Sequence, residues 1–330
     1  MLKNLKVIEL ASVLAGPMVG TFFAELGAEV IKIENKTTQG DVTRQWKLPT
    51  ENQSNKSSAY YAAANFGKKS LFLDVKNKED YNQVIALVKD ADIVIANFKT
   101  GAAQKLQLDF DSIRKINPAI IYGEITGFGE NEKRTAFDVV LQAETGFMSM
   151  NGEPTGKPVK MPVALIDILA AHQLKEGLLL ALLNRTDEAQ KVSVSLYDTA
   201  VASLANQATN WLIAKHIAQP MGTLHPNIAP YGELFLTKDE KWLVLAIGND
   251  KQFAQLCNAI EQSELSDEDK FSINPNRVKN REELSEIIQK SIKTATGEYW
   301  SSLLSSKDIP YGIVNNMKEV FDDKKAQQLI

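Results

Sequence analysis

Two carboxylates in the middle of the chain are the residues best suited to chemistry. Asp167 follows the turn-rich segment NGEPTGKPVKMP (151–162) and the apolar VALI, at the predicted start of a strongly apolar helix. A carboxylate at a helix N-terminus is kept ionised and held in place by the helix dipole. Such a group suits a nucleophile that attacks a carbonyl carbon. Aspartate is also a preferred N-cap residue, so its position alone leaves a purely structural role open.

The second carboxylate, Asp138, lies in the segment FDVVLQAETG, with Gln142 one helical turn later. Helix capping accounts equally well for an aspartate there. Gln142 fits an exposed polar residue just as well as a functional one. Taken singly, neither position establishes a function.

Other segments indicate a ligand near the predicted strand ends. The segment NFKTGAAQKL (97–106) follows a strand end, where open α/β sheets commonly bind ligands. The segment GKKS (67–70) and Lys105 have the charge to meet phosphate groups, and so do Lys32 and Arg44. For all of these basic residues the alternative is an ordinary solvated surface.

The elements that must position these residues alternate between strand and helix over the first two hundred residues. This alternation predicts a parallel sheet covered by helices on both faces. Strands are predicted at 7–10, 29–33, 70–73, 92–96, 119–122 and 191–196. Helices are predicted at 17–26, 78–90, 108–116, 138–149 and 167–184, and a long helix is expected to follow the last strand and end near His216.

The pattern changes around residue 217. The Pro/Gly-rich stretch AQPMGTLHPNIAPYG predicts a linker over 217–232. A hairpin (ELFLT-KDEK-WLVLAIG) and helices at 250–261, 281–294 and 297–305 follow it. We therefore predict an α/β protein with a large parallel-sheet domain over 1–216 and a smaller α+β domain over 233–330.

The first β-α-β unit, LKVIELASVLAGPMVGTFFAELGAEVIKIE (5–34), looks like the opening of a dinucleotide-binding domain. Its second strand ends in Glu34, the place of the acid that would hold a ribose. Its turn, however, contains only Gly16 and Gly20 and does not read G-x-G-x-x-G. Pro17 also removes a backbone donor where a phosphate would need one. The unit predicts a fold, and its support for NAD is weak.

Composition excludes several classes of function. A formal net charge of −4 offers no basic field for nucleic acid. The single cysteine, Cys257, leaves no internal disulfide or cysteine metal cluster and fits a reducing cytoplasm. The three histidines lack metal-ligand spacing, so we expect no metal. No apolar run approaches the ~18 residues of a membrane helix, and no signal peptide is evident.

Several blocks occur in an order that resembles the class III CoA-transferase family, which includes formyl-CoA transferases and related 2-methylacyl-CoA racemases. They span most of the chain: the 5–34 stretch, GDVTRQW, NFGKKSLFLDVK, ADIVIANFKTGAAQKL, INPAIIYGEITGFG, FDVVLQAETGFMSMNG and HPNIAPYGELF with LAIGNDKQF. The resemblance implies a Rossmann-like large domain that serves CoA and not NAD. It also implies acyl-CoA and carboxylic acid substrates, no permanently bound cofactor and an interlocked homodimer.

The resemblance assigns roles to individual positions. The family's catalytic aspartate falls on Asp167, which would carry an aspartyl-acyl anhydride and then an aspartyl-CoA thioester. A second acidic position of some transferases falls on Asp138, with Gln142 in the same helix turn. The implied CoA contacts are Val13, Leu14, Ala15, Asn97, Phe98 and Lys105. Lys105 replaces a more usual arginine and so loses bidentate phosphate contact.

Three further features indicate which members of the family this chain resembles most, transferases or racemases. Related racemases have a histidine before Asp138, where this chain has Phe137, which cannot accept a proton. The HPNIAPYGELF and LAIGNDKQF blocks look like the subgroup that uses dicarboxylyl-CoA donors such as succinyl-CoA. In that subgroup His225 would lie close to the site, although a structural role in the linker accounts for it equally well. The chain stops at FDDKKAQQLI, so we expect the family's C-terminal return segment to be short or missing. A catalytically silent CoA-binding protein is the alternative from another class.

Overall fold

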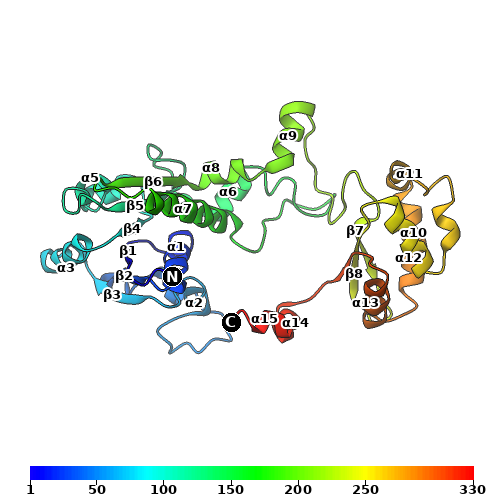
Figure 1. Cartoon of the computed structure of the whole chain (residues 1–330), viewed down its shortest axis with the longest axis horizontal. Coiled ribbons are helices and arrows are strands. Elements are labelled where there is room, and N and C mark those ends of the chain that lie inside the picture. The colour runs from blue at the N-terminus through cyan, green and yellow to red at the C-terminus, as the bar shows by residue number, and fades with distance from the viewer. The chain divides into compact units, whose positions relative to one another are not determined.

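The structure, a computed structural model, describes residues 1–330 and divides into two compact units (Figure 1). Unit 1 comprises Met1–Asn151 and Pro158–Gln219, and unit 2 comprises Gly152–Lys157 and Pro220–Ile330. The main boundary lies three residues beyond the predicted one at 216. Residues 220–232 of the predicted linker, and the short segment 152–157, group with unit 2.

Unit 1 is built on a six-stranded parallel sheet in the order β3-β2-β1-β4-β5-β6. The strands are β1 (Lys6–Glu9), β2 (Glu29–Asn35), β3 (Lys69–Leu73), β4 (Ile93–Ala96), β5 (Ile121–Thr126) and β6 (Gln190–Ser195). Each of the six predicted strands is present within two residues of its predicted start. The predicted α/β class is therefore confirmed.

Successive residues of a strand point to opposite sides, and the central strands of the sheet are buried on both faces. Val7 and Ile93 pack in one apolar cluster with residues of the helices α1 (Ala15–Glu25) and α7 (Leu165–Leu183). Their neighbours Ile8 and Val94 pack in a second cluster, on the side of the helices α3 (Lys78–Lys89) and α5 (Phe110–Ile113). This double burial explains why the central strands read as continuous apolar runs in the sequence.

Most helices of unit 1 lie between these strands in the chain, while α8 (Leu196–Ala202) and α9 (Ala205–Ala214) follow the last strand, and α9 projects away from the sheet (Figure 1). The helices between the strands are α1 (Ala15–Glu25), α2 (Ala59–Ala62), α3 (Lys78–Lys89), α4 (Ala102–Lys105), α5 (Phe110–Ile113), α6 (Asp138–Glu144) and α7 (Leu165–Leu183), with two 3-10 turns, η1 (Lys36–Thr38) and η2 (Val42–Gln45). The α7 helix spans the largest number of residues and packs against α1, β5 and β6.

One prediction about these helices is wrong. A single long helix was expected to end near His216, but the structure has two, α8 and α9, separated at Ser203 and Leu204. Ala205 takes a positive φ of 49° at the break. The apolar residues that suggested one continuous helix include exposed ones on α9, so they do not form one buried stripe.

Unit 2 contains a three-stranded antiparallel sheet and several helices. The strands are β7 (Tyr231–Leu236), β8 (Trp242–Ala246) and β9 (Tyr311–Ile313), in the order β7-β8-β9. The helices are α10 (Asp250–Ala259), η3 (Ser263–Ser266), α11 (Asn274–Lys279), α12 (Arg281–Ile292), α13 (Gly297–Ser306), α14 (Met317–Asp322) and α15 (Lys324–Gln327). The predicted hairpin and all three predicted helices are present.

The segment before β7 is anchored to unit 2 and is not a free linker. The Arg281 guanidinium donates hydrogen bonds of 2.6 and 2.7 Å to the carbonyls of His225 and Ile228. The Asn274 side chain donates to the Asn227 carbonyl at 2.8 Å. In the whole chain, none of the helices has the length and hydropathy needed to cross a bilayer.

Candidate active site

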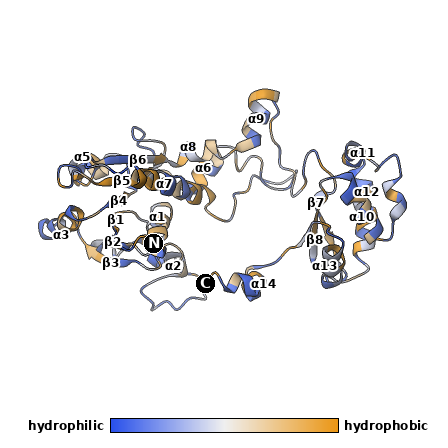
Figure 2. Cartoon of the chain, viewed as in Figure 1, coloured by the Kyte–Doolittle hydropathy of each residue, from blue (hydrophilic) through white to orange (hydrophobic).

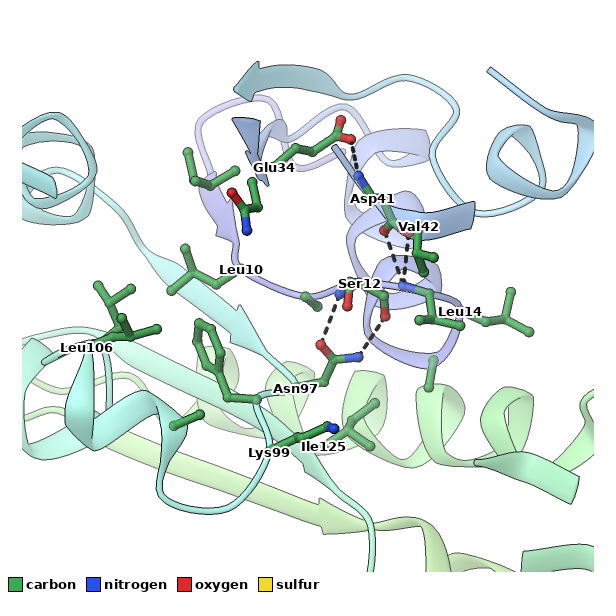
Figure 3. A pocket seen from close by; sticks show the side chains of 18 of the residues that line it. Leu10, Ser12, Leu14, Glu34, Asp41, Val42, Asn97, Lys99, Leu106 and Ile125 are labelled. Carbon is green, nitrogen blue, oxygen red and sulfur yellow. Dashed lines mark hydrogen bonds between the residues drawn. The ribbon is translucent and has the colours of Figure 1, made fainter. Parts of the chain in front are cut away.

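A cavity of about 610 Å³ opens in unit 1 at the carboxyl ends of β1 and β4. The strand order reverses between these two strands, and open α/β sheets bind their ligands at such a reversal. The cavity is lined by the β1–α1 turn, the end of β2 and the segment after β4 (Figure 3), and by Asp167 in the first turn of α7. Its size suits a nucleotide-sized ligand.

Most of the predicted ligand-binding residues do line this cavity. Val13, Leu14, Ala15, Asn97 and Phe98 are all part of its wall. The α1 helix begins beside them at Ala15 without a side-chain cap, so its first N–H groups remain available to a ligand.

The two glycines of the β1–α1 turn serve helix packing. A Cβ on Gly16 would lie 2.4 Å from the Ala11 Cβ, and a Cβ on Gly20 would lie 1.8 Å from Oε2 of Glu9. Both glycines therefore allow α1 to approach the preceding strand and turn closely. This role in packing agrees with the interpretation of the sequence, in which the two glycines do not form an NAD-binding motif.

The acid at the end of β2 is already fully engaged. Glu34 accepts two hydrogen bonds from Arg44, at 2.6 and 2.7 Å, and others from the Tyr61 hydroxyl and the Asp41 backbone. Burial raises the pKa of Glu34, but these hydrogen bonds and one from Ser70 outweigh it and lower the pKa to about 2. The carboxylate that would hold the ribose of NAD is thus committed to the protein itself, and so is Arg44.

Asn97 links the two strand ends that form the cavity floor. Its Oδ1 accepts from the Ser12 N–H at 2.9 Å, and its Nδ2 donates to the Ser12 carbonyl at 2.7 Å (Figure 3). The side-chain amide is therefore occupied by the backbone of the neighbouring turn. Asn97 borders the ligand space, but its polar atoms shape the turn.

Val13 shows backbone strain beside the cavity. Its φ is +71°, and it is the only β-branched residue among the eight non-glycine residues with positive φ. Such a conformation costs ~1–3 kcal/mol and persists only where the surroundings impose it. Nothing in the local sequence signalled this strain, because Val13 reads as part of an apolar run.

The basic residues proposed as phosphate contacts are either buried in ion pairs or exposed at the surface. Lys32 and Lys68 are buried in ion pairs with Glu9, which removes the GKKS lysine Lys68 from the candidates for phosphate binding. Lys69, the other lysine of that segment, is exposed and pairs with Glu29 at 2.7 Å.

Three basic side chains that the sequence reading did not single out line the cavity: Lys76, Lys99 and Arg134. Lys99 lies in the segment 97–106, which the sequence predicted to be near a ligand. Its position just after a strand could therefore have identified it as a ligand-binding residue. Lys105, at the end of α4, is exposed and is not part of the cavity wall.

Asp167 lies in the first turn of α7 and lines the cavity. The N-cap of this helix is Ala164, so the alternative that Asp167 itself caps the helix is wrong. Burial, with a smaller contribution from the nearby Asp138 carboxylate, raises the pKa of Asp167 to about 7. This direction is opposite to the expectation that the helix dipole keeps Asp167 ionised. Desolvation outweighs the dipole at this position.

Asp138 and Gln142 support the helix that carries Asp167. Asp138 Oδ1 accepts from the Ile166 N–H at 2.7 Å and so caps α7 from a different helix. Its Oδ2 accepts from Gln142 Nε2 at 2.5 Å, and Gln142 Oε1 accepts from the Met161 N–H at 2.8 Å. Both side chains are buried, so the reading of Gln142 as an exposed residue is wrong. Neither lines the cavity.

His225 and Phe137 complete the predicted positions. His225 lies in unit 2, where its ring contacts Tyr231 edge to face and its Nδ1 accepts from the Asn227 N–H at 3.2 Å. Phe137 is the N-cap residue of α6, lines the cavity and is 53% exposed.

The cavity at the switch point of a parallel α/β unit has the Asp167 carboxylate in its wall, so a ligand bound there would lie beside this carboxylate. The chain belongs to CoA-transferase family III, whose family model matches residues 2–329. The family predicted from the sequence is thereby confirmed, and with it the assignment as a CoA-transferase enzyme.

The similar proteins support the predicted subgroup as well. The chain is 39% identical to a succinate–glutarate CoA-transferase of Agrobacterium fabrum, over 99% of this chain and 83% of that protein. It is 34% identical to the human succinyl-CoA:glutarate CoA-transferase, over 98% of this chain and 74% of that protein. A crystal structure of a CAIB/BAIF family protein from Brucella suis matches with a TM-score of 0.87 at 36% identity, covering 99% and 87% of the two chains.

Proposed function

We propose that the protein transfers CoA from a dicarboxylyl-CoA, with succinyl-CoA as the first candidate donor, to a second carboxylic acid through Asp167. The observation that supports this most directly is the position of the Asp167 carboxyl, the one acidic side chain on the α7 wall of the cavity. The named activities of the relatives, which act on succinate, glutarate and mesaconate, indicate the class of donor.

The reaction proceeds in balanced acyl-transfer steps. The Asp167 carboxylate attacks the thioester carbonyl, the C–S bond breaks and CoA thiolate leaves, which gives an aspartyl-acyl anhydride. The thiolate then attacks the aspartyl carbonyl, releases the donor acid and forms an aspartyl-CoA thioester. The acceptor carboxylate repeats these two steps in reverse and leaves as the new acyl-CoA. Each step exchanges one acyl bond for another, so covalent catalysis needs no outside energy source.

The cavity offers groups for each part of a CoA ligand. The uncapped start of α1, behind Leu14 and Ala15, provides N–H groups for a phosphate. Lys99 and Arg134 add positive charge to the wall. Phe98 and Leu106 give apolar contact for a flat ring. Lys105, exposed beyond α4, stays a predicted contact for an outer phosphate.

Asp138 and Gln142 hold Asp167 in place in this proposal and do not react themselves. Asp138 fixes the N–H next to Asp167 in the α7 turn, and its negative charge helps to raise the pKa of Asp167. A carboxylate with a pKa near 7 is a stronger nucleophile than an ordinary one, and it becomes fully ionised only above neutral pH.

The two alternatives gain no support from a specific observation. A racemase needs a second proton acceptor, and Phe137 lines the cavity at the family's position for one. A catalytically silent protein would bind CoA in the cavity, but Asp167 would not form a covalent intermediate.

Isotope exchange between labelled succinate and unlabelled succinyl-CoA tests the proposal, because this exchange runs on one acid and needs no knowledge of the acceptor. Label should enter the thioester with the wild-type protein and not with Asp167→Ala. CoA should bind this variant within about threefold of wild type, because the carboxylate acts on the thioester carbon. Mass spectrometry of the quenched reaction should find CoA attached to the peptide that contains Asp167. Exchange that persists in Asp167→Ala would refute the mechanism.

The proposal includes the homodimer and the cytoplasmic location expected from the sequence. Support for association comes from exposed apolar residues on α9, including Leu212 at 64% and Ile213 at 83% exposure (Figure 2). Such residues mark interaction surfaces in soluble proteins. Sedimentation of the purified chain tests the dimer, and a monomer at micromolar concentration would contradict it.

A further inference from the structure

Four buried charges surround the β1–α1 turn, and two of them, Lys32 and Asp41, belong to residues that also line the cavity. Lys32 Nζ lies 2.8 Å from Glu9 Oε1 and 3.1 Å from Asp41 Oδ2. Lys68 Nζ lies 2.7 Å from the other Glu9 oxygen. All four side chains are at most 1% exposed, and their formal charges cancel. Buried charges are costly even when paired, so a cluster of four invites a functional explanation.

The lysines of the cluster form hydrogen bonds with the backbone of the turn. Lys32 Nζ donates to the Ala11 carbonyl at 2.8 Å, and Lys68 Nζ donates to the Pro17 carbonyl at 2.7 Å. The two lysines therefore hold the carbonyls on either side of the turn. Between them lies Val13, the strained residue with φ of +71°.

Asp41 holds the strained residue itself. Its Oδ2 accepts from the Val13 N–H at 3.1 Å (Figure 3). Its Oδ1 accepts from the N–H and the hydroxyl of Thr43, at 3.0 and 2.8 Å, which fixes the carboxylate in place. The Asp41 N–H donates to Glu34 Oε2 at 2.8 Å. Asp41 Oδ2 is therefore shared between the Lys32 ammonium and the peptide N–H of Val13, while Thr43 holds the other oxygen.

We propose that Asp41 and Lys32 are positioning residues that keep Val13 in its left-handed conformation and so preform the turn that receives acyl-CoA. The inference rests on the proposed use of this cavity by CoA. A β-branched residue leaves this conformation once the restraint is gone. The turn would then have to be reordered on binding, which weakens affinity for the nucleotide part and leaves the chemistry at Asp167 intact.

Removing the restraint should therefore affect binding more than turnover. Asp41→Asn is expected to raise both the Kd for CoA and the KM for succinyl-CoA about tenfold, while kcat changes by less than about threefold. Asp109→Asn is the matched control. Asp109 also caps a helix and accepts from a following hydroxyl, that of Ser112 at 2.7 Å, but it does not line the cavity.

Glycine at position 13 distinguishes positioning from a general loss of structure. Glycine adopts positive φ without strain. In a Val13→Gly background, Asp41→Asn should therefore cost less than about threefold in Kd, whatever Val13→Gly does alone. A general structural defect would instead give the same factor in both backgrounds.

A milder variant covers the case in which Asp41→Asn does not fold. Thr43→Val removes one hydrogen bond to Asp41 without changing the buried charge. It should raise the Kd for CoA about threefold, and this effect should disappear in the Val13→Gly background.

The outcomes separate this inference from the proposed function. CoA binding that weakens in the Asp41 and Thr43 variants and recovers with Val13→Gly supports the inference. If wild type binds CoA and neither Asp41→Asn nor Thr43→Val changes the Kd, the inference is overturned and the proposed function is not. Failure of the wild-type protein to bind CoA overturns the proposed function, and the inference with it.

Discussion

Replacing Asp167 by asparagine should make the folded protein more stable at alkaline pH. Burial and the Asp138 carboxylate raise the pKa of Asp167 from 3.8 to about 7. An acid whose pKa is raised by folding contributes stability below its unfolded pKa and loses it as the pH rises through the folded pKa. Above about pH 7 the wild-type protein therefore holds an unfavourable charge that asparagine lacks.

The size of this effect follows from the shift. At ~1.4 kcal/mol per pKa unit, the rise from 3.8 to about 7 corresponds to at most ~4 kcal/mol. Asp167 is only half-buried, and solvent that reaches it reduces the value to ~2 kcal/mol. The variant should match wild type at about pH 4 and exceed it by this amount at about pH 8.5.

Urea unfolding of both proteins across this pH range measures the difference, since the groups distant from Asp167 contribute equally to both proteins and cancel. Asp187→Asn, at an exposed aspartate in the loop after α7, controls for the change of one charge. A difference that stays constant with pH would show that Asp167 is not perturbed. A wild-type protein that gains stability over the variant as the pH rises would mean that the helix dipole dominates.

Three other predictions concern the same unit. The rate of the succinate exchange at saturating substrate should rise with pH up to about 7 and then level off, because the proposed nucleophile is the ionised Asp167; a pH-independent rate would exclude a carboxylate titrating there. Asp138→Ala should lower the exchange rate less than Asp167→Ala does, because Asp138 only caps the N-terminal turn of α7, and equal losses would assign it a direct role. Gly20→Ala should destabilise the protein by ~2–4 kcal/mol in urea unfolding, because the new Cβ would lie 1.8 Å from the Glu9 carboxylate. Gly248→Ala, whose Cβ would meet only a side-chain oxygen at 3.5 Å, is the control, and a comparable loss there would remove the steric explanation.

The sequence by itself determined the architecture of unit 1. The inner strands β1, β2, β4 and β5 are mostly buried, so they appear as short apolar runs that can be read locally. All six runs became strands, and the ligand segment after β4 followed from the position of its strand end. The helix that carries Asp167 could also be predicted from the sequence, because its apolar run is long and begins directly after a Pro/Gly segment.

The tertiary structure alone decided how the polar side chains are used. Asp138 caps a helix 28 residues away, and Asn97 bonds to a turn 85 residues away. Val13 has a positive φ, and its N–H donates to Asp41, which lies 28 residues away. Burial of a charged group, its partners and its pKa all depend on what the fold packs around it, and no local pattern of residue types contains that information.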